Sequence, residues 1–224
     1  MQRGFFVAID GPSGMGKSTI TGLLAGQLAA RGCSVLATKE PTATPLGSLA
    51  RFGTDDYHGL TLACLVAADR YQHLEQEIRP AVQAGQIVLS DRYVASSLVL
   101  QRLDGVPPEF VWQLNQHADR PDLYIILSGD VACARKRAEK RGLYSRFHRG
   151  GHVIGMAEAA LYATAAADLT EHGFEVLTHD IDAQTPGQVA EALAAAVLAR
   201  RRLSPALPER HGPASRTSRQ CGQP

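Results

Sequence analysis

The 224-residue sequence lacks the marks of a membrane protein, a secreted protein or a nucleic-acid coat. No apolar run approaches the roughly 20 residues that a transmembrane helix needs. The N-terminus, Met1-Gln2-Arg3-Gly4, leads almost at once into an apolar run, unlike a signal peptide. The formal net charge is only +1, which argues against a basic surface for nucleic acid or membranes. We therefore expect a cytoplasmic protein whose partners are neither nucleic acid nor membrane.

Cysteine is also scarce, and its spacing carries no motif. The four cysteines lie far apart with no Cys-x-x-Cys pair: Cys33, Cys64, Cys133 and Cys221. This pattern excludes the usual zinc motifs and a disulfide framework, so we expect reduced thiols. A content of 45% hydrophobic and 20% charged residues is ordinary for a globular protein. The length suits one α/β domain with a full core.

A glycine-rich segment near the N-terminus is the strongest local signal. Residues 11–18 match G-x-x-x-x-G-K-[ST], between the apolar run 5–9 and an amphipathic segment. Its residues, with the next one, are Gly11, Pro12, Ser13, Gly14, Met15, Gly16, Lys17, Ser18 and Thr19. Glycines let backbone N–H groups turn inward around a phosphate, and the helix N-terminus adds further donors. Lys17 supplies positive charge and the Ser18 hydroxyl can ligate Mg²⁺. A glycine-rich turn before a helix is the alternative, but the strand and helix around it favour nucleoside triphosphate binding.

Short apolar runs alternate with helical patterns along the rest of the chain. The runs, each apolar through its centre as expected of strands buried on both faces, are 4–9, 34–38, 86–90, 122–127 and 174–178. The helical patterns cover about 17–31, 59–84, 94–118, 130–140, 152–172 and 186–203. Gly32 and Gly173 are placed to end two of these helices. The alternation predicts an α/β fold, a three-layer α/β/α P-loop NTPase with a five-stranded parallel sheet. Ligands should lie beyond the carboxyl ends of the strands.

The end of the chain has a different composition. From Ser204 onward, prolines mix with Arg, Ser, Gly and Gln, and no apolar period continues. Such a segment cannot offset its own ordering entropy. We expect one domain over 1–203 and a disordered tail over 204–224, although its arginines could also contact an acidic partner.

Charged residues follow the third predicted strand at the edge where the phosphate loop lies. Asp91 can hold a Mg²⁺-bound water, and Arg92 can bind a phosphate with two parallel hydrogen bonds. Alone, these neighbours could be a surface ion pair. Other charged segments point to the same crevice: Asp69-Arg70, Lys39-Glu40-Pro41 and Arg51.

A further basic segment extends from Arg135 to Arg149, with glycines at its end. Its first part is typical of a solvated helix face. We interpret about 141–151 as a short mobile lid, because arginines closing over a transferring phosphoryl group stabilise its transition state.

Together these segments resemble the thymidylate kinase family, P-loop enzymes that phosphorylate deoxythymidine monophosphate (dTMP) with ATP. The resemblance covers about residues 5–200, and its segments occur in order. They are 6–11 with the phosphate loop, 39–41 with 44–47, 67–70, 91–93 with Ser96, Ser97 and Gln101, 120–123, and Arg146-Phe147.

The resemblance implies ATP and Mg²⁺ as cofactors, a nucleoside monophosphate as substrate and a homodimer. It implies that Lys17, Lys39, Arg92 and Arg146 act in catalysis, and that Ser18 and Asp91 support Mg²⁺. The implied acceptor-binding residues are Asp10, Arg51, Val66, Arg70, Arg92, Ser96, Ser97, Gln101 and Tyr162. Among these, Asp10 would approach the 3′-hydroxyl, Arg70 the base edge and Arg92 the acceptor phosphate. Lys39 or Arg51 would lie near the transferring group, and Tyr162 would close over the sugar. In some family members an arginine within the phosphate loop assists the transfer. Because the phosphate loop of this chain carries no arginine, the lid would supply that positive charge.

Departures from the family pattern fall on the acceptor side. Val66 occupies the position of an aromatic residue that stacks on thymine, and Leu100 replaces the usual aromatic before Gln101. Pro41-Thr42-Ala43-Thr44 replaces the usual Pro-Gly-Gly-Thr. Stacking is worth about 1–3 kcal/mol per base, so its loss weakens or redirects base recognition. The first expectation is phosphorylation of dTMP to dTDP; the alternatives are a same-fold kinase for a different or modified nucleotide and a nucleotide-dependent binding module.

Overall fold

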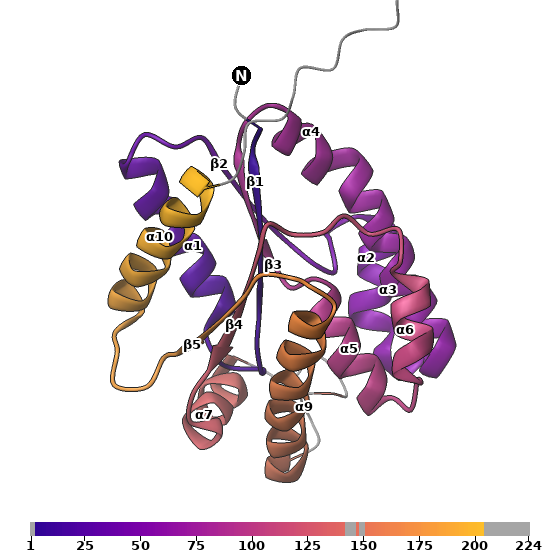
Figure 1. Ribbon diagram of the computed structural model, residues 1–224. Coiled ribbons are helices and arrows are strands. Elements are labelled where there is room, and N and C mark those ends of the chain that lie inside the picture. Colours follow the sequence, from indigo (N-terminus) through magenta and orange to yellow (C-terminus); the bar gives the residue numbers. More distant parts are fainter. Residues whose placement is uncertain (1–2, 142–146, 148–150, 204–224) are drawn as a thin grey trace, which may run out of the picture.

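The computed structural model describes residues 3–141, 147 and 151–203, and Figure 1 shows their arrangement. Most of the expected lid, with Arg146, and the expected tail over 204–224 lie outside the described residues. None of the described helices combines the length and the apolarity that crossing a bilayer requires.

A parallel sheet of five strands forms the centre of the fold, as the sequence predicted. The strands are β1 (Phe5–Asp10), β2 (Val35–Lys39), β3 (Ile87–Asp91), β4 (Leu123–Ser128) and β5 (Val176–Asp180). Their order is β2-β3-β1-β4-β5, and each lies one or two residues later than expected. The expectation that every strand is buried on both faces was wrong for β2 and β5, which are half-buried. These two are the edge strands, with a neighbour on one side only.

Helices cover both faces of the sheet and divide the core in two. On one face, α1 (Lys17–Ala30) and α10 (Pro186–Leu203) pack on Phe5, Val7 and Ile9. On the other face, α5 (Val94–Leu103) and α9 (Gly151–Glu171) pack on Phe6 and Ala8. Because side chains of β1 alternate between the two faces, one strand supplies both cores. This arrangement leaves the carboxyl ends of the central strands open for a site.

Two predicted helices are interrupted in the structure. The segment 59–84 is helical throughout, but α3 (Gly59–His73) is separated from α4 (Arg79–Gln83) by the π-helix η2 (Leu74–Ile78). The expectation of one helix over 94–118 was wrong, because α5 ends at Leu103 and α6 (Pro108–Leu114) begins after a turn. Gly105 in that turn has φ of 80°, and two prolines, which lack an N–H donor, follow it.

One helix near the site has no counterpart among the predictions. Helix α2 (Pro45–Phe52) begins after Thr44, whose side chain accepts a hydrogen bond from the backbone N of Gly47. Proline at the first helical position and threonine before it are ordinary start signals. A 3₁₀ turn, η1 (Gly53–Asp55), follows α2, and α7 (Val131–Arg141) follows β4. The predicted glycine ends are confirmed, with φ of 79° at Gly32 and 73° at Gly173.

Candidate active site

The phosphate loop joins β1 to α1 through glycines whose positions exclude a side chain. Gly11 and Gly14 have φ of 143° and 84°. A Cβ at Gly11 would lie 2.5 Å from the carbonyl oxygen of Leu127, and one at Gly14 would lie 1.9 Å from that of Ala134. The loop is therefore pressed against β4 and α7, and only glycine permits this approach.

Lys17 is buried beneath this loop. Its Nζ donates hydrogen bonds to the carbonyl oxygens of Gly11 at 2.6 Å and Pro12 at 2.9 Å. Burial disfavours the ammonium form, and Arg92 repels it, so the pKa of Lys17 is lowered to about 7; nearby carboxylates offset this only in part. The protein environment therefore weakens the preference of Lys17 for the charged form that it would offer to a phosphate.

Ser18 and Asp91 bring two oxygen ligands together from different elements. Strand pairing places Asp91 opposite Ile9, beside the loop, and Ser18 Oγ donates to Asp91 Oδ2 at 2.5 Å. The other carboxylate oxygen, Oδ1, is buried and meets no hydrogen-bond donor among the described residues. A hydroxyl and a carboxylate with an unused oxygen suit Mg²⁺, which prefers oxygen ligands. The residues present therefore fit a divalent cation.

A second polar group surrounds Arg92, just after β3. Arg92 has φ of 81°, an uncommon conformation for a residue with a side chain. Its Nη1 donates to Ser96 Oγ at 3.0 Å and to Tyr162 Oη at 3.4 Å. Ser96 Oγ in turn donates to Asp10 Oδ1 at 2.6 Å. The guanidinium is thus oriented by α5 and α9 together.

Asp10 lies behind this group, fully buried. Burial raises the pKa of its carboxyl against the opposing effects of the Ser96 hydrogen bond, Arg92 and Lys17. Its Oδ2 has no hydrogen-bond partner among the described residues. Asp10 is not among the residues that line the neighbouring cavity, and neither is Tyr162.

A cavity of about 210 Å³ joins the phosphate loop to α2, α3 and α5. Most residues expected in the site line it: Gly14, Gly16, Lys17, Ser18, Lys39, Arg51, Val66, Arg70, Asp91, Arg92, Ser96, Ser97 and Gln101. The lining also includes Leu100 and six residues to which the sequence analysis assigned no role, namely Glu40, Pro41, Ala50, Thr54, Leu62 and Phe147. Glu40 and Phe147 directly follow Lys39 and Arg146 in segments that already pointed to the site, whereas Thr54 carries no signal in the sequence.

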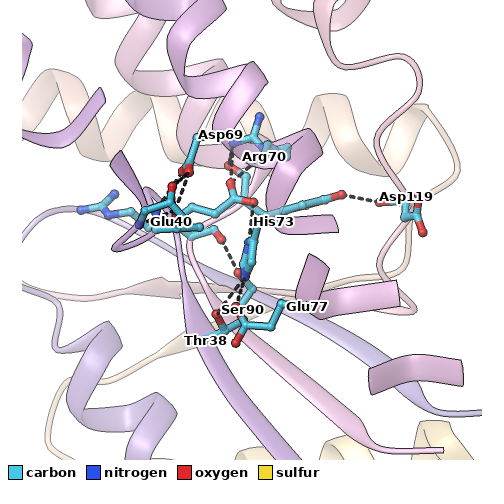
Figure 2. Close-up of polar contacts among 12 residues, drawn as sticks. Thr38, Glu40, Asp69, Arg70, His73, Glu77, Ser90 and Asp119 are labelled. Atoms are coloured by element: carbon cyan, nitrogen blue, oxygen red, sulfur yellow. Dashed lines mark hydrogen bonds and ion pairs between the residues drawn. The ribbon is translucent and has the colours of Figure 1, made fainter. Parts of the chain in front are cut away.

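Arg70 lies at the wall of this cavity within a buried network (Figure 2). Its Nε donates to Glu40 Oε2 at 2.8 Å, and its Nη2 lies 2.8 Å from the same oxygen. Nη1 donates to Asn115 Oδ1 at 2.5 Å, and Nη2 donates to the carbonyl oxygen of Tyr93 at 3.0 Å. Most of its five N–H groups are therefore occupied by the protein, which fixes the plane of the guanidinium.

Asp69, the preceding residue, supports the loop after β2. Its Oδ2 accepts from the backbone N of Thr42 at 2.8 Å, and its Oδ1 accepts from Thr42 Oγ1 at 2.5 Å. Oδ1 also lies 3.4 Å from Thr44 Oγ1, the residue that caps α2. Asp69 thus orients α2, the helix that carries Arg51 to the cavity.

One contact of the phosphate loop has no counterpart in the sequence patterns. Glu158 Oε1, on α9, accepts from both the backbone N and the Oγ of Ser13, at 3.1 and 3.0 Å. One turn later the same helix presents Tyr162 to Arg92. Helix α9 therefore contacts both the phosphate loop and the arginine after β3.

Comparisons with known proteins identify the family and agree with the fold. The sequence model of the thymidylate kinase family matches residues 9–153. A probable thymidylate kinase of Pyrobaculum aerophilum is 39% identical over 181 residues, covering 76% of this chain and 91% of the relative. One of Pyrobaculum calidifontis is 36% identical over 198 residues, covering 86% and 95%. The thymidylate kinase structure from Candida albicans has the same fold, with a TM-score of 0.74, 18% identity and coverage of 91% and 95%. With the phosphate loop, the Asp91-Arg92 pair and the cavity between them in place, the chain belongs to the thymidylate kinase family of P-loop enzymes.

Proposed function

We propose that this chain transfers the γ-phosphoryl group of ATP to dTMP, giving dTDP and ADP. The observation that carries the proposal is the shared cavity, in which Lys17 and Ser18 of the phosphate loop meet Arg70 and Gln101 of the opposite wall. At about 210 Å³ it is smaller than the roughly 300–1,000 Å³ of a site that encloses one whole ligand. We therefore assign the cavity to the part of the site where the phosphate loop faces the acceptor wall.

ATP binds, in this proposal, through the backbone of residues 11–19 and through Lys17. The inward-facing N–H groups and the N-terminus of α1 form an anion site. Ser18 and Asp91 would hold Mg²⁺, supported by the unused Oδ1 of Asp91. Bound there, Mg²⁺ would neutralise negative charge on the ATP phosphates.

The acceptor occupies the wall formed by α3 and α5. Arg92 would bind the acceptor phosphate, oriented by Ser96 and Tyr162. Gln101 would meet the base edge, and its buried Oε1 has no partner among the described residues, which suits a ligand donor. Ser97, Val66 and Arg70 would complete the wall. Arg70 would donate to the base through an N–H group that is not already bonded within the protein.

In the transfer, an oxygen of the acceptor phosphate attacks the γ-phosphorus of ATP. The bond from that phosphorus to the β–γ bridging oxygen breaks, and the electron pair leaves with ADP. An ionised phosphate is already a competent nucleophile, so the step needs positioning and charge neutralisation and no general base. Lys17, Lys39 and Arg51 line the cavity and would lie near the transferred group, and we assign Arg146 of the lid the remaining charge.

Asp10 would serve this site indirectly. The resemblance placed it near the acceptor 3′-hydroxyl, yet its carboxyl lies behind Ser96 and outside the lining of the cavity. We therefore propose that Asp10 holds Ser96, which in turn orients Arg92 and Tyr162.

Steady-state assays over a panel of nucleoside monophosphates with ATP and Mg²⁺ test the proposal. We expect the highest kcat/KM for dTMP among the common nucleotides. Turnover of none of them would refute it, and ATP hydrolysis that no acceptor stimulates would favour a nucleotide-dependent binding module instead.

A second candidate is a kinase of the same fold for a different or modified pyrimidine nucleotide. Val66 and Leu100 favour it, since both line the cavity with aliphatic side chains where the family has aromatic ones. A kcat/KM for dTMP far below that for another acceptor would establish this alternative.

We also propose that the protein is a homodimer. Helix α3 carries a shallow apolar groove lined by Leu60, Thr61, Cys64, Leu65 and Ala68. Leu60 is 53% exposed, and Phe52, the last residue of α2, is 64% exposed. Light scattering on the wild type and on Leu60→Glu tests this, with a shift to monomer expected for the variant.

A further inference from the structure

A buried histidine next to the acceptor wall has no part in the transfer described above. His73 is the last residue of α3, and its side chain is 1% exposed. Figure 2 shows its ring between Glu40 on one side and Thr38 with Glu77 on the other. A buried imidazole with partners at both nitrogens has a fixed orientation.

The Nδ1 side of the ring leads to the cavity. Nδ1 lies 3.3 Å from Glu40 Oε1, while the other oxygen of that carboxylate accepts from Arg70 Nε at 2.8 Å. Each oxygen of Glu40 thus meets one of the two residues. Since an ionised carboxylate only accepts, Nδ1 carries the proton in this contact. A buried carboxylate needs donors to both oxygens. Arg70 supplies the donor to one oxygen of Glu40, and His73 supplies the donor to the other.

The Nε2 side anchors the ring to the scaffold. Nε2 lies 2.8 Å from Thr38 Oγ1 of edge strand β2 and 3.2 Å from Glu77 Oε2 of η2. Thr38 Oγ1 also lies 3.1 Å from Glu77 Oε2, so its single hydroxyl proton goes either to Glu77 or to Nε2. These contacts therefore fix the position of the ring between edge strand β2 and the π-helix η2.

We propose that His73 is a positioning residue for acceptor recognition. By donating from Nδ1 to Glu40, it holds the carboxylate that sets the plane of Arg70 at the cavity wall. Asn115 and Tyr93 also bind Arg70, so loss of His73 shifts the guanidinium rather than releasing it. This inference rests on the proposed function, because it concerns the acceptor half of that same site.

Two amide substitutions separate the two sides of the ring. The amide nitrogen of asparagine lies about where Nδ1 lies, so His73→Asn keeps a donor for Glu40. Glutamine places its amide near Nε2, so His73→Gln keeps the contacts to Thr38 and Glu77 and leaves Glu40 Oε1 without its donor. We expect the dTMP KM, and the dTMP dissociation constant by calorimetry, to rise about tenfold in His73→Gln, because a displaced Arg70 guanidinium would lose about one charge-assisted hydrogen bond to the acceptor. His73→Asn should stay within about threefold of wild type, and kcat and the ATP KM within about twofold in both.

Several outcomes would overturn the inference. Equal dTMP KM values in the two variants, or a change that falls equally on ATP and dTMP, would mean that His73 only stabilises the fold. If His73→Gln does not fold by circular dichroism, the ¹⁵N chemical shift of His73 Nδ1 in the wild type replaces it. We expect this shift to change when dTMP binds and to stay the same when ATP binds; a shift that dTMP leaves unchanged would refute the proposal. An active wild type with indistinguishable variants refutes this inference alone, whereas a wild type inactive on every acceptor refutes the proposed function and this inference with it.

Discussion

The buried Lys17 predicts that ATP binding takes up a proton. Its pKa is about 7 in the nucleotide-free protein, because burial and Arg92 disfavour the ammonium. Triphosphate oxygens favour the charged form, so bound ATP should raise that pKa. One pH unit above a pKa of about 7, roughly one tenth of the free protein carries the proton, so binding at pH 8 should take up about 0.9 proton.

Isothermal titration calorimetry at pH 8 in buffers of different ionisation enthalpy measures this uptake directly. ATP and its Mg²⁺ complex are fully ionised there, so the proton goes to the protein. Uptake should fall to about 0.1 proton at pH 6, where the free lysine is already charged. Lys17→Arg is the control, because a guanidinium stays protonated and should give no uptake. Uptake below about 0.2 proton at pH 8 in the wild type would refute the reasoning.

The same pKa has a consequence for stability. In the unfolded chain Lys17 has its ordinary pKa of 10.5, so between about pH 7 and 10.5 the unfolded state binds more protons than the folded state. The contribution of Lys17 to the free energy of unfolding therefore rises with pH across this window, by up to about 1.4 kcal/mol per pH unit. Below pH 7 both states are protonated and the cost of burying the charge is present in full.

Substitutions at four positions test the remaining geometry. Val66→Phe should lower the dTMP dissociation constant, measured by calorimetry, at least fivefold, because stacking of the base on an aromatic ring is worth about 1–3 kcal/mol. Val66→Leu, which adds no ring, should not lower it. Glu158→Ala removes the acceptor of two Ser13 hydrogen bonds and should raise the ATP KM about tenfold. Glu158→Gln, whose amide oxygen still accepts, should raise the ATP KM less. Equal ATP KM values in the two variants would contradict the reasoning. Asp91→Asn should raise the Mg²⁺ concentration for half-maximal rate about tenfold, and an unchanged Mg²⁺ dependence would exclude Asp91 as a ligand. Gly14→Ala, whose Cβ would lie 1.9 Å from the Ala134 carbonyl oxygen, should abolish ATP binding in a filter or calorimetric assay, and wild-type affinity would show that the loop can yield.

Sequence patterns determined most of the architecture because the relevant physics is local. Each apolar run lies within two residues of a strand, since a short apolar run bounded by polar residues suits a parallel sheet covered by helices. The glycines at 32 and 173 end helices through their own backbone freedom. The break in 94–118 was also local, since Gly105 and two prolines mark it, but the prediction treated the whole segment as one helix.

The phosphate loop and the residues at the strand ends were likewise within reach of the sequence alone. A parallel sheet brings the carboxyl ends of its strands to one edge, so Asp91 had to lie near Lys17 and Ser18. Only the tertiary structure decided the pairings between segments that are distant in the sequence. Glu158 meets Ser13 across 145 residues, Arg70 finds Glu40 and Asn115, and Asp10 lies behind Ser96. No local rule sets these contacts, because each depends on how α3, α5 and α9 pack against the sheet and on which charges that packing buries together.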